Sequence, residues 1–234
     1  MHRVVNRELL DELSPADPRA VSSRIDLRRL NFIMGHESTL ARAFHLYLSR
    51  QFQPSRPVRV VDLGAGDGRL LLRIAARCLP LNLTVQATLV DRQTIVSLET
   101  RRAFAALNWS VECVETDALT WLEQSYPTSD LMFANLFLHH FPDKPLRALL
   151  GLAAGRTNEF IACEPRRSPI ALTASRMLWL MGCNSVTRHD AIASVCAGFV
   201  GRELTELWPS QTGWELSEHP FGFFSHSFVA KRHV

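Results

Sequence analysis

The sequence predicts an α/β fold built on a largely parallel β-sheet. Short apolar segments alternate with helical segments, and the apolar segments begin about every 20–30 residues, the length of a strand–helix unit with a right-handed crossover. Most of these segments are apolar throughout, as expected for strands covered on both faces. The chain has 234 residues, which is enough for one such domain with a core and short for two.

The N-terminal part is expected to be helical. Residues 1–25 are polar and typical of a helix followed by a turn. Residues 26–52 predict a helix broken near Gly35, with apolar residues on one face of its second half. We therefore expect a helical cap over residues 1–52 and a main domain over residues 53–234.

The main domain is predicted to hold five parallel strands, a helical insert at about residues 168–210 and a terminal hairpin. The hairpin strands, Trp214–His219 and Phe224–Ala230, must be antiparallel because the connection at residues 220–222 is short. The predicted parallel strands are Val58–Leu63, Val85–Val90, Val111–Val114, Leu131–Leu136 and Phe160–Cys163. The predicted helices are Arg69–Leu79, Gln93–Leu107, Ala118–Gln124, Pro145–Ala154, Ser168–Gly182, Asp190–Ala197 and Glu203–Leu207.

Composition and charge argue against several classes of protein. The formal net charge is only +3 and the basic residues are scattered, so a nucleic-acid partner is not expected. No apolar run reaches 18 residues, so no membrane span is expected. The five cysteines show neither a CxxC pair nor His/Cys zinc spacing, which predicts no metal site and favours a reducing cytoplasm. The sequence leaves open whether the chain is a monomer or a homodimer.

A glycine-rich loop follows the first predicted strand. Gly64, Gly66 and Gly68 let the backbone turn tightly and approach a ligand, and the next helix offers its N-terminus. The dinucleotide fingerprint needs a third glycine at position 69, where this chain has Arg69. Asp62 before the loop suits the ammonium group of S-adenosylmethionine better than a pyrophosphate. The alternative is a turn that only packs helix on strand.

Two further acids follow the next two predicted strands. Asp91 ends the second strand, where a carboxylate can bind two ribose hydroxyls. This position predicts a nucleoside site without distinguishing S-adenosylmethionine from NAD. Asp117, before Ala118, can accept a hydrogen bond from an adenine amino group, or it can be the N-cap of the helix that follows.

In these motifs the chain resembles class I S-adenosylmethionine-dependent methyltransferases, in particular the small-molecule group related to the ubiquinone/menaquinone methyltransferases. The resemblance rests on Val60–Gly68, Asp91, Asp117 and the stretch Asp130–Asp143 with its Leu-His-His turn, and it covers roughly residues 55–165. It implies a Rossmann-like seven-stranded sheet with the last strand antiparallel and helices on both faces. The resemblance implies S-adenosylmethionine as cofactor, held by Asp62, Gly64, Gly66, Asp91, Asp117, Ala118 and Asn135.

The expected reaction is methyl transfer to oxygen or carbon of a small, aromatic, phenolic or quinone-like acceptor. After Asn135 the chain lacks the Pro-Pro-Tyr that follows Asn/Asp in amino-methylating nucleic-acid enzymes, which counts against DNA or RNA bases. His139 and His140 follow the fourth strand, so either is a candidate general base. The alternative is that both are structural residues of the turn.

Other polar side chains have two interpretations each. His189 beside Asp190 is a candidate oriented base, unless Asp190 is simply the N-cap of the helix from Ala191. Glu164 after the fifth strand would contact the acceptor or pair with an arginine.

The apolar residues of the insert would line an acceptor pocket or form helix core; they are Met177, Trp179, Leu180, Met181 and Phe199. Two rival functions remain at this point, a nicotinamide oxidoreductase on the same topology and a non-catalytic accessory protein that keeps the fold.

Overall fold

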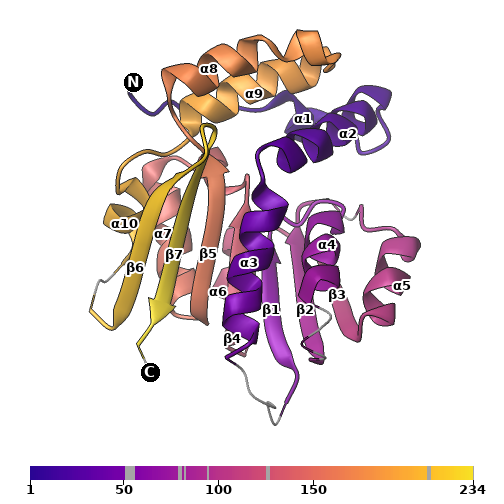
Figure 1. Ribbon diagram of the computed structural model, residues 1–234, viewed down its shortest axis with the longest axis vertical. Coiled ribbons are helices and arrows are strands. Elements are labelled where there is room, and N and C mark those ends of the chain that lie inside the picture. Colours follow the sequence, from indigo (N-terminus) through magenta and orange to yellow (C-terminus); the bar gives the residue numbers. More distant parts are fainter. Residues whose placement is uncertain are drawn as a thin grey trace.

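The computed structural model describes residues 1–50, 56–78, 81, 83–93, 95–124, 127–209 and 212–233. Within this part of the chain a seven-stranded sheet forms the centre of the molecule, in the order β3-β2-β1-β4-β5-β7-β6 (Figure 1). The strands are β1 Val58–Leu63, β2 Val85–Asp91, β3 Trp109–Glu115, β4 Ser129–Asn135, β5 Thr157–Pro165, β6 Trp214–Phe221 and β7 Ser225–Arg232.

Strands β1 to β5 pair in parallel, whereas β7 is antiparallel to both β5 and β6. This arrangement confirms the predicted seven-stranded sheet with its last strand antiparallel. The predicted position of the hairpin turn is wrong, because β6 continues through Pro220 and Phe221 and the turn lies at residues 222–224. Pro220 is tolerated because β6 is the edge strand, where a missing backbone donor disrupts little pairing.

Helices surround the sheet, most of them at positions close to those predicted. The predictions differ for α5, which begins at Leu98 and not at Gln93, and for Ser168–Gly182, which is divided into α8 and η3. Gly35, with φ +73°, separates α2 from α3 and confirms the predicted break. Residues 51 and 52 of the predicted second helix, Leu79 and Thr94 lie outside the described residues. The helices are α1 Leu9–Glu12, α2 Pro18–Ile33, α3 His36–Leu48, α4 Arg69–Cys78, α5 Leu98–Ala106, α6 Ala118–Glu123, η2 Leu138–His140, α7 Asp143–Ala154, α8 Pro169–Arg176, η3 Leu178–Met181, α9 Ser185–Ala197 and α10 Glu203–Leu207.

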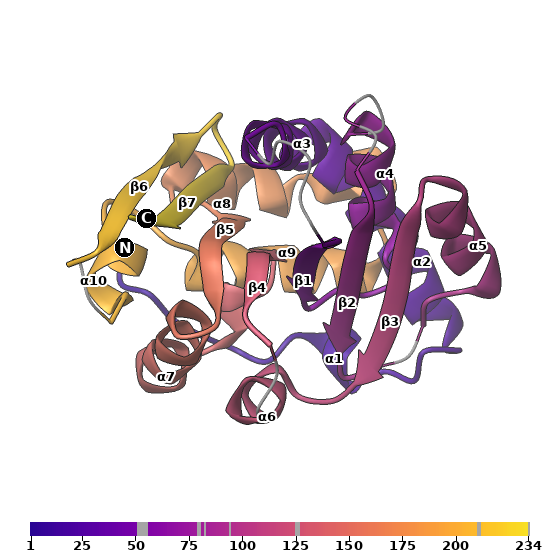
Figure 2. The ribbon, with the colours of Figure 1, turned by 90° about the horizontal axis from the view of Figure 1, so that it is seen from below.

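The helices form one layer on each face of the sheet (Figure 2). Helices α3, α4 and α5 pack with one set of strand side chains, of which Val60 is an example. Helices α6, α7 and α10 pack with the opposite set, which includes Val61. Successive strand residues point to opposite faces, so β1 contributes to both cores and must be apolar along nearly its whole length.

The remaining helices lie over the carboxyl ends of the parallel strands. Figure 1 shows α1, α2, α8 and α9 above the edge toward which β5 points. Helix α9 contacts α1, α2, α8 and η2, so the N-terminal segment and the helices after β5 form one cover over this edge. The carboxyl edge is where ligands bind in open α/β sheets. No helix of the described residues is long and apolar enough to cross a membrane.

Candidate active site

The loop between β1 and α4 has the geometry that its glycines permit. Gly64, Gly66 and Gly68 have φ values of +76°, +55° and +71°, which side-chain-bearing residues adopt only with strain. The amides of Gly64 and Ala65 donate to the carbonyl of Val90, which ties the loop to the end of β2. The loop therefore bends sharply at the carboxyl edge of the sheet.

Gly64 is also required by a close neighbour. A Cβ atom at this position would lie 2.4 Å from the ring of Phe137, far inside van der Waals contact. At Gly66 an added Cβ would meet nothing within 4 Å. The two glycines thus share a backbone requirement, and only Gly64 has a steric one.

The two predicted acids lie on neighbouring strands at the same edge. Asp62 near the end of β1 is buried, and burial followed by the charge of Asp91 raises the pKa of its carboxyl well above the usual value. Within the described residues no hydrogen bond reaches the Asp62 carboxylate. Asp91 accepts hydrogen bonds from the amides of Gly66 (2.8 Å) and Gln93 (2.9 Å). Asp91 therefore connects β2 to the glycine loop, while the Asp62 carboxylate has no cationic partner among the described residues.

Asp117 is the N-cap of α6. Its Oδ1 accepts from the amide of Leu119 at 2.9 Å, as one of the two sequence interpretations predicted. The amide of Thr116 donates to the Asp91 carbonyl, so Asp117 follows β3 beside the end of β2. Ala118 is buried in the core under α6. The cofactor contacts of both residues stay a prediction.

Asn135 ends β4 and contacts the N-terminal helices. Its Oδ1 lies 2.8 Å from Nδ1 of His36, and Nε2 of His36 lies 2.6 Å from the Ser225 hydroxyl. Burial lowers the pKa of His36 to about 4, so the ring is neutral at pH 7. Since an amide oxygen only accepts, Nδ1 carries the proton and Nε2 accepts from Ser225. This chain of contacts joins α3, β4 and β7.

After Asn135 the backbone makes a strained turn into η2. Leu136 has φ +51°, an unusual value for a residue with a side chain. Buried Glu164 then accepts from the amides of Phe137 at 3.0 Å and Leu138 at 2.9 Å. Among the described residues its ion pair is with His139 and not with an arginine, so the predicted arginine pair is wrong, whereas contact with the acceptor stays a prediction. Its carboxylate accepts from the amides at the start of η2, which have no partner within this short helix.

His139 is held between two carboxylates. Its Nδ1 lies 2.7 Å from Glu164 and its Nε2 lies 3.2 Å from Glu8, which comes from the segment before α1. Burial lowers the pKa of His139, but the hydrogen bonds to Glu164 and Glu8 outweigh it and raise the pKa to about 9. The protonated ring uses both nitrogens as donors at pH 7 and cannot accept a proton.

The ring of His140 lies beside that of His139, but it has a different protonation state. Burial and then the charge of His139 lower the pKa of His140, so its ring is neutral at pH 7. Its Nδ1 is 3.4 Å from Asp11 and its Nε2 is 4.0 Å from Glu8. With a side chain that is 24% exposed, His140 is the accessible one of the two histidines.

The N-terminal segment supplies groups that sequence reasoning missed. Arg3 donates to the carbonyls of His139 and Phe141, and Ser194 on α9 donates to Glu8. Burial raises the pKa of Glu8, but the hydrogen bond to His139 more than offsets this and the pKa falls to about 2. No local sequence pattern predicts a site role for Glu8, because the residues that it contacts lie more than a hundred positions away in the chain.

His189 lies apart from this cluster. Its side chain is 52% exposed on α9, and its Nδ1 contacts Asp190 at 3.0 Å. The predicted N-cap role of Asp190 is wrong, because α9 begins at Ser185 and Asn184 caps it. Asp190 instead accepts from the amides of Leu9 (2.8 Å) and Leu10 (2.9 Å) at the start of α1.

The insert residues divide between surface and core. Phe199 is fully buried, as the helix-core interpretation predicted. That interpretation is wrong for the other four, which are between 47% and 59% exposed: Met177, Trp179, Leu180 and Met181. Their apolar side chains therefore form part of the surface near α8 and η3.

Comparison with known proteins gives a consistent assignment. A family model described as "Methyltransferase domain" matches residues 60–157, which span β1 to the start of β5 and include the glycine loop, Asp91 and both histidines of η2. The match assigns a methyltransferase domain to the part of the chain that holds the glycine loop and η2. The match confirms the resemblance inferred from the sequence motifs, and it leaves the ubiquinone-related subgroup compatible without confirming it.

Solved structures share the fold at low sequence identity. The plantazolicin methyltransferase BamL, crystallised with a desmethylplantazolicin analogue and S-adenosylhomocysteine, has a TM-score of 0.64 at 13% identity, over 94% of this chain and 93% of that one. Magnesium protoporphyrin IX methyltransferase from Synechocystis PCC 6803, with bound S-adenosylmethionine, gives 0.53 at 13% identity, over 96% and 88%. The pyocyanin biosynthetic protein PhzM gives 0.57 at 20% identity, over 97% and 62%. No curated protein sequence matches the chain.

Proposed function

We propose that this chain transfers the methyl group of S-adenosylmethionine to oxygen or carbon of a small, aromatic, phenolic or quinone-like acceptor. The observation that carries the proposal is the convergence of the glycine loop, Asp62 and Asp91 at one edge of the sheet. The cofactor supplies a methyl group already activated on a sulfonium, so the protein needs no covalent intermediate. What the residues must do is bind, orient and exclude water.

Two features of the site fit this cofactor. Asp62 is a buried carboxylate that no donor of the described residues satisfies, so an ammonium group beside it offsets the cost of its burial. Each oxygen of Asp91 accepts one backbone amide, and each carboxylate oxygen can accept two bonds. The Asp91 oxygens therefore keep capacity for the two ribose hydroxyls. In this proposal the Gly64 and Gly66 backbone lies against the methionine part, and Asp117, Ala118 and Asn135 complete the pocket.

We assign the base for a hydroxyl acceptor to His140. His139 donates through both nitrogens and has no lone pair to offer, whereas His140 is neutral and partly exposed. A base of this kind contributes about 10²- to 10⁴-fold to the rate. His139 is then a positioning residue, since its ring lies 4.4 Å from that of His140, centroid to centroid. His189 is the weaker assignment because it is exposed and paired with Asp190.

The acceptor class is supported by aromatic side chains beside η2 and by the similar structures. Phe137 and Phe141 flank η2 with ring centroids 5.1 Å apart, and aromatic side chains suit a planar acceptor. Similar folds belong to a plantazolicin methyltransferase and to a mitomycin 7-O-methyltransferase, whose names give plantazolicin and mitomycin as the compounds that they methylate. All five cysteines are free thiols, which supports a reducing cytoplasm as the place of this activity. Sedimentation velocity distinguishes a monomer from a homodimer of this chain.

Calorimetric titration with S-adenosylhomocysteine tests the cofactor assignment. We expect binding in the micromolar range or tighter, and at least a tenfold loss, about 1.4 kcal/mol, for Asp91→Ala. Glu99→Ala is the matched control, since Glu99 is an exposed acid in the helix that follows β2. Titration with NAD should give no heat of binding. Equal affinity of the wild type and Asp91→Ala for S-adenosylhomocysteine would refute the ribose assignment, and absence of binding would favour a non-catalytic accessory protein.

A second experiment tests turnover. The protein is incubated with S-adenosylmethionine carrying an isotopically labelled methyl group and a panel of phenols and hydroquinones. We expect label in at least one aromatic product and a loss of that signal in His140→Ala. Labelled product formed only from amines would contradict the acceptor class.

A further inference from the structure

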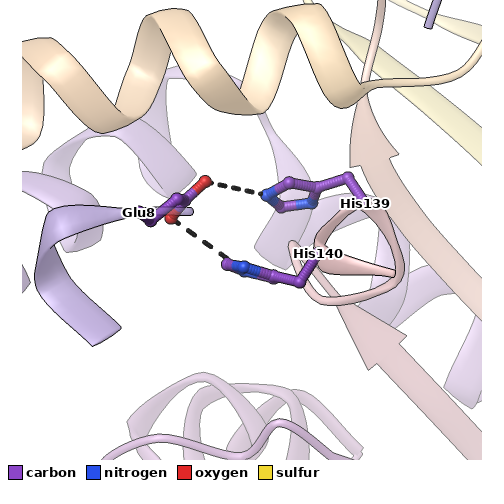
Figure 3. Close-up of side chains that lie close together, drawn as sticks. All are labelled: Glu8, His139 and His140. Carbon is purple, nitrogen blue, oxygen red and sulfur yellow. Dashed lines mark hydrogen bonds and ion pairs between the residues drawn. The ribbon is translucent and has the colours of Figure 1, made fainter. Parts of the chain in front are cut away.

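Three metal-binding side chains from two distant parts of the chain converge beside the proposed base. Glu8, His139 and His140 each place a ligand atom within 4.8 Å of the other two. Figure 3 shows the carboxylate of Glu8 directed at both imidazole rings. From this convergence we propose that Glu8, His139 and His140 bind a divalent first-row transition-metal ion, with Zn²⁺ as the representative ligand.

The separations suit such an ion. Tetrahedral zinc with bonds of 2.0–2.2 Å to nitrogen and oxygen needs its ligand atoms about 3.4 Å apart. Here Nε2 of His139 lies 3.2 Å from Glu8 Oε1, and Nε2 of His140 lies 4.0 Å from Glu8 Oε2. All three ligand atoms already lie within 4.8 Å of one another, so binding of the ion requires only a modest approach of these side chains.

The surroundings of both rings follow the pattern of metal-ligating histidines. Such histidines bind the ion through one nitrogen and hold a carboxylate or carbonyl with the other. Nδ1 of His139 contacts Glu164 at 2.7 Å, and Nδ1 of His140 contacts Asp11 at 3.4 Å, so both Nε2 atoms point to Glu8. An ion pair between Glu8 and one histidine would not need a second oriented ring. Here two separate carboxylates orient two adjacent rings, as a metal site requires.

Charge favours a cation at this point. Glu8, Glu164 and Asp11 lie around the two rings, and the Asp190 carboxylate is close enough to act on Asp11. Arg92 is the opposing cation that acts on Asp11. A divalent ion that binds here displaces the proton between His139 and Glu8. The net charge of the cluster then rises by one unit, and proton release should accompany binding.

Two histidines and one glutamate leave at least one coordination position open, as in catalytic zinc sites. The opening lies on the side of His140 and Asp11, whose side chains are 24% and 54% exposed. Since an ion and a proton would use the same lone pair of His140, its role as base applies to the metal-free protein. The metal site rests on the donor set alone and is independent of the methyl acceptor.

The test is a zinc titration of the full chain. Protein freed of metal by a chelator is titrated with Zn²⁺ against a chromophoric competitor. We expect one zinc ion per chain and at least a tenfold loss of affinity in both Glu8→Gln and His140→Gln. Glu12→Gln and His45→Gln, exposed positions outside the cluster, serve as matched controls and should bind zinc as the wild type does.

Substitution with Co²⁺ supplies a readout of the ligands. We expect visible bands of nitrogen and oxygen ligation in the wild type and their loss in His140→Gln. Circular dichroism and S-adenosylhomocysteine binding of each variant show that it is folded, and they keep this site separate from the cofactor site. Binding of fewer than one zinc per chain, unchanged affinity in the two folded variants, or a cobalt–thiolate charge-transfer band would overturn the proposal.

Discussion

Replacing Gly64 by alanine should damage the protein in two separable ways. The residue has φ +76°, and a left-handed conformation costs about 1–2 kcal/mol for a residue with a Cβ. The new Cβ would also lie 2.4 Å from Cδ2 of Phe137, and overpacking of this kind costs about 1–3 kcal/mol. We therefore expect Gly64→Ala to lower the free energy of unfolding by about 2–5 kcal/mol, the sum of the two effects.

Gly66→Ala separates the two contributions. Gly66 also has a positive φ, +55°, but its added Cβ meets nothing within 4 Å. Only the backbone cost applies, so this variant should lose about 1–2 kcal/mol. Urea unfolding followed by circular dichroism measures both values, with the slope against denaturant compared to check two-state behaviour.

A double-mutant cycle with Phe137→Ala then isolates the steric effect. Removing the ring makes room for the new Cβ, so Gly64→Ala should cost only its backbone share in the Phe137→Ala background. If Gly64→Ala is no more destabilising than Gly66→Ala, or if the cycle shows no coupling, the close packing of Phe137 on the loop is not what requires glycine there.

Other predictions concern the polar residues at the same edge. Glu164→Gln should lower the free energy of unfolding by about 3–5 kcal/mol, because protonated His139 loses a buried partner; urea unfolding that shows no loss would refute this. His140→Ala should reduce kcat by about 10²- to 10⁴-fold while the affinity for S-adenosylhomocysteine stays unchanged, and a variant with wild-type kcat would exclude His140 as base. Below pH 6.5 the unfolded chain protonates His36, whereas the folded ring, with its pKa at about 4, does not. The free energy of unfolding should therefore be highest above pH 6.5 and fall by about 3 kcal/mol between pH 6.5 and 4. This fall should be absent in His36→Asn. If the free energies of unfolding of the two proteins change in parallel with pH, the prediction is wrong.

Much of the fold could be predicted from local patterns. The bounds of β1 agree residue by residue with the prediction, since a buried parallel strand is apolar on both faces and ends at glycines. The break at Gly35 was predictable because a left-handed residue interrupts a helix. The turn after β6 was not, because Pro220 normally ends a strand and only the edge position makes it acceptable.

The residues expected to bind the cofactor could also be predicted from the sequence. Of the histidine cluster, only the two histidines could be predicted, and not the carboxylates that contact them. Asp62 and Asp91 are placed by the alternation of strands and helices, which brings the ends of β1 and β2 together. The partners of His139 are Glu8 and Glu164, which only the tertiary fold brings to it. Glu8 lies before α1 in a segment without helical or strand periodicity, so no spacing rule connects it with His139 at the carboxyl edge of the sheet.

The hydrogen bonds between the N-terminal segment and the end of α9 have a consequence for folding during synthesis. Val4 donates to the carbonyl of Cys196, and Arg3 donates to Ala197. Residues 3 and 4 therefore cannot complete these contacts before α9 has been synthesised, and contacts so distant along the chain form slowly. A nascent chain that ends before α9 would hold the glycine loop and η2 without these contacts, so catalytic competence should arrive only after α9 has been made.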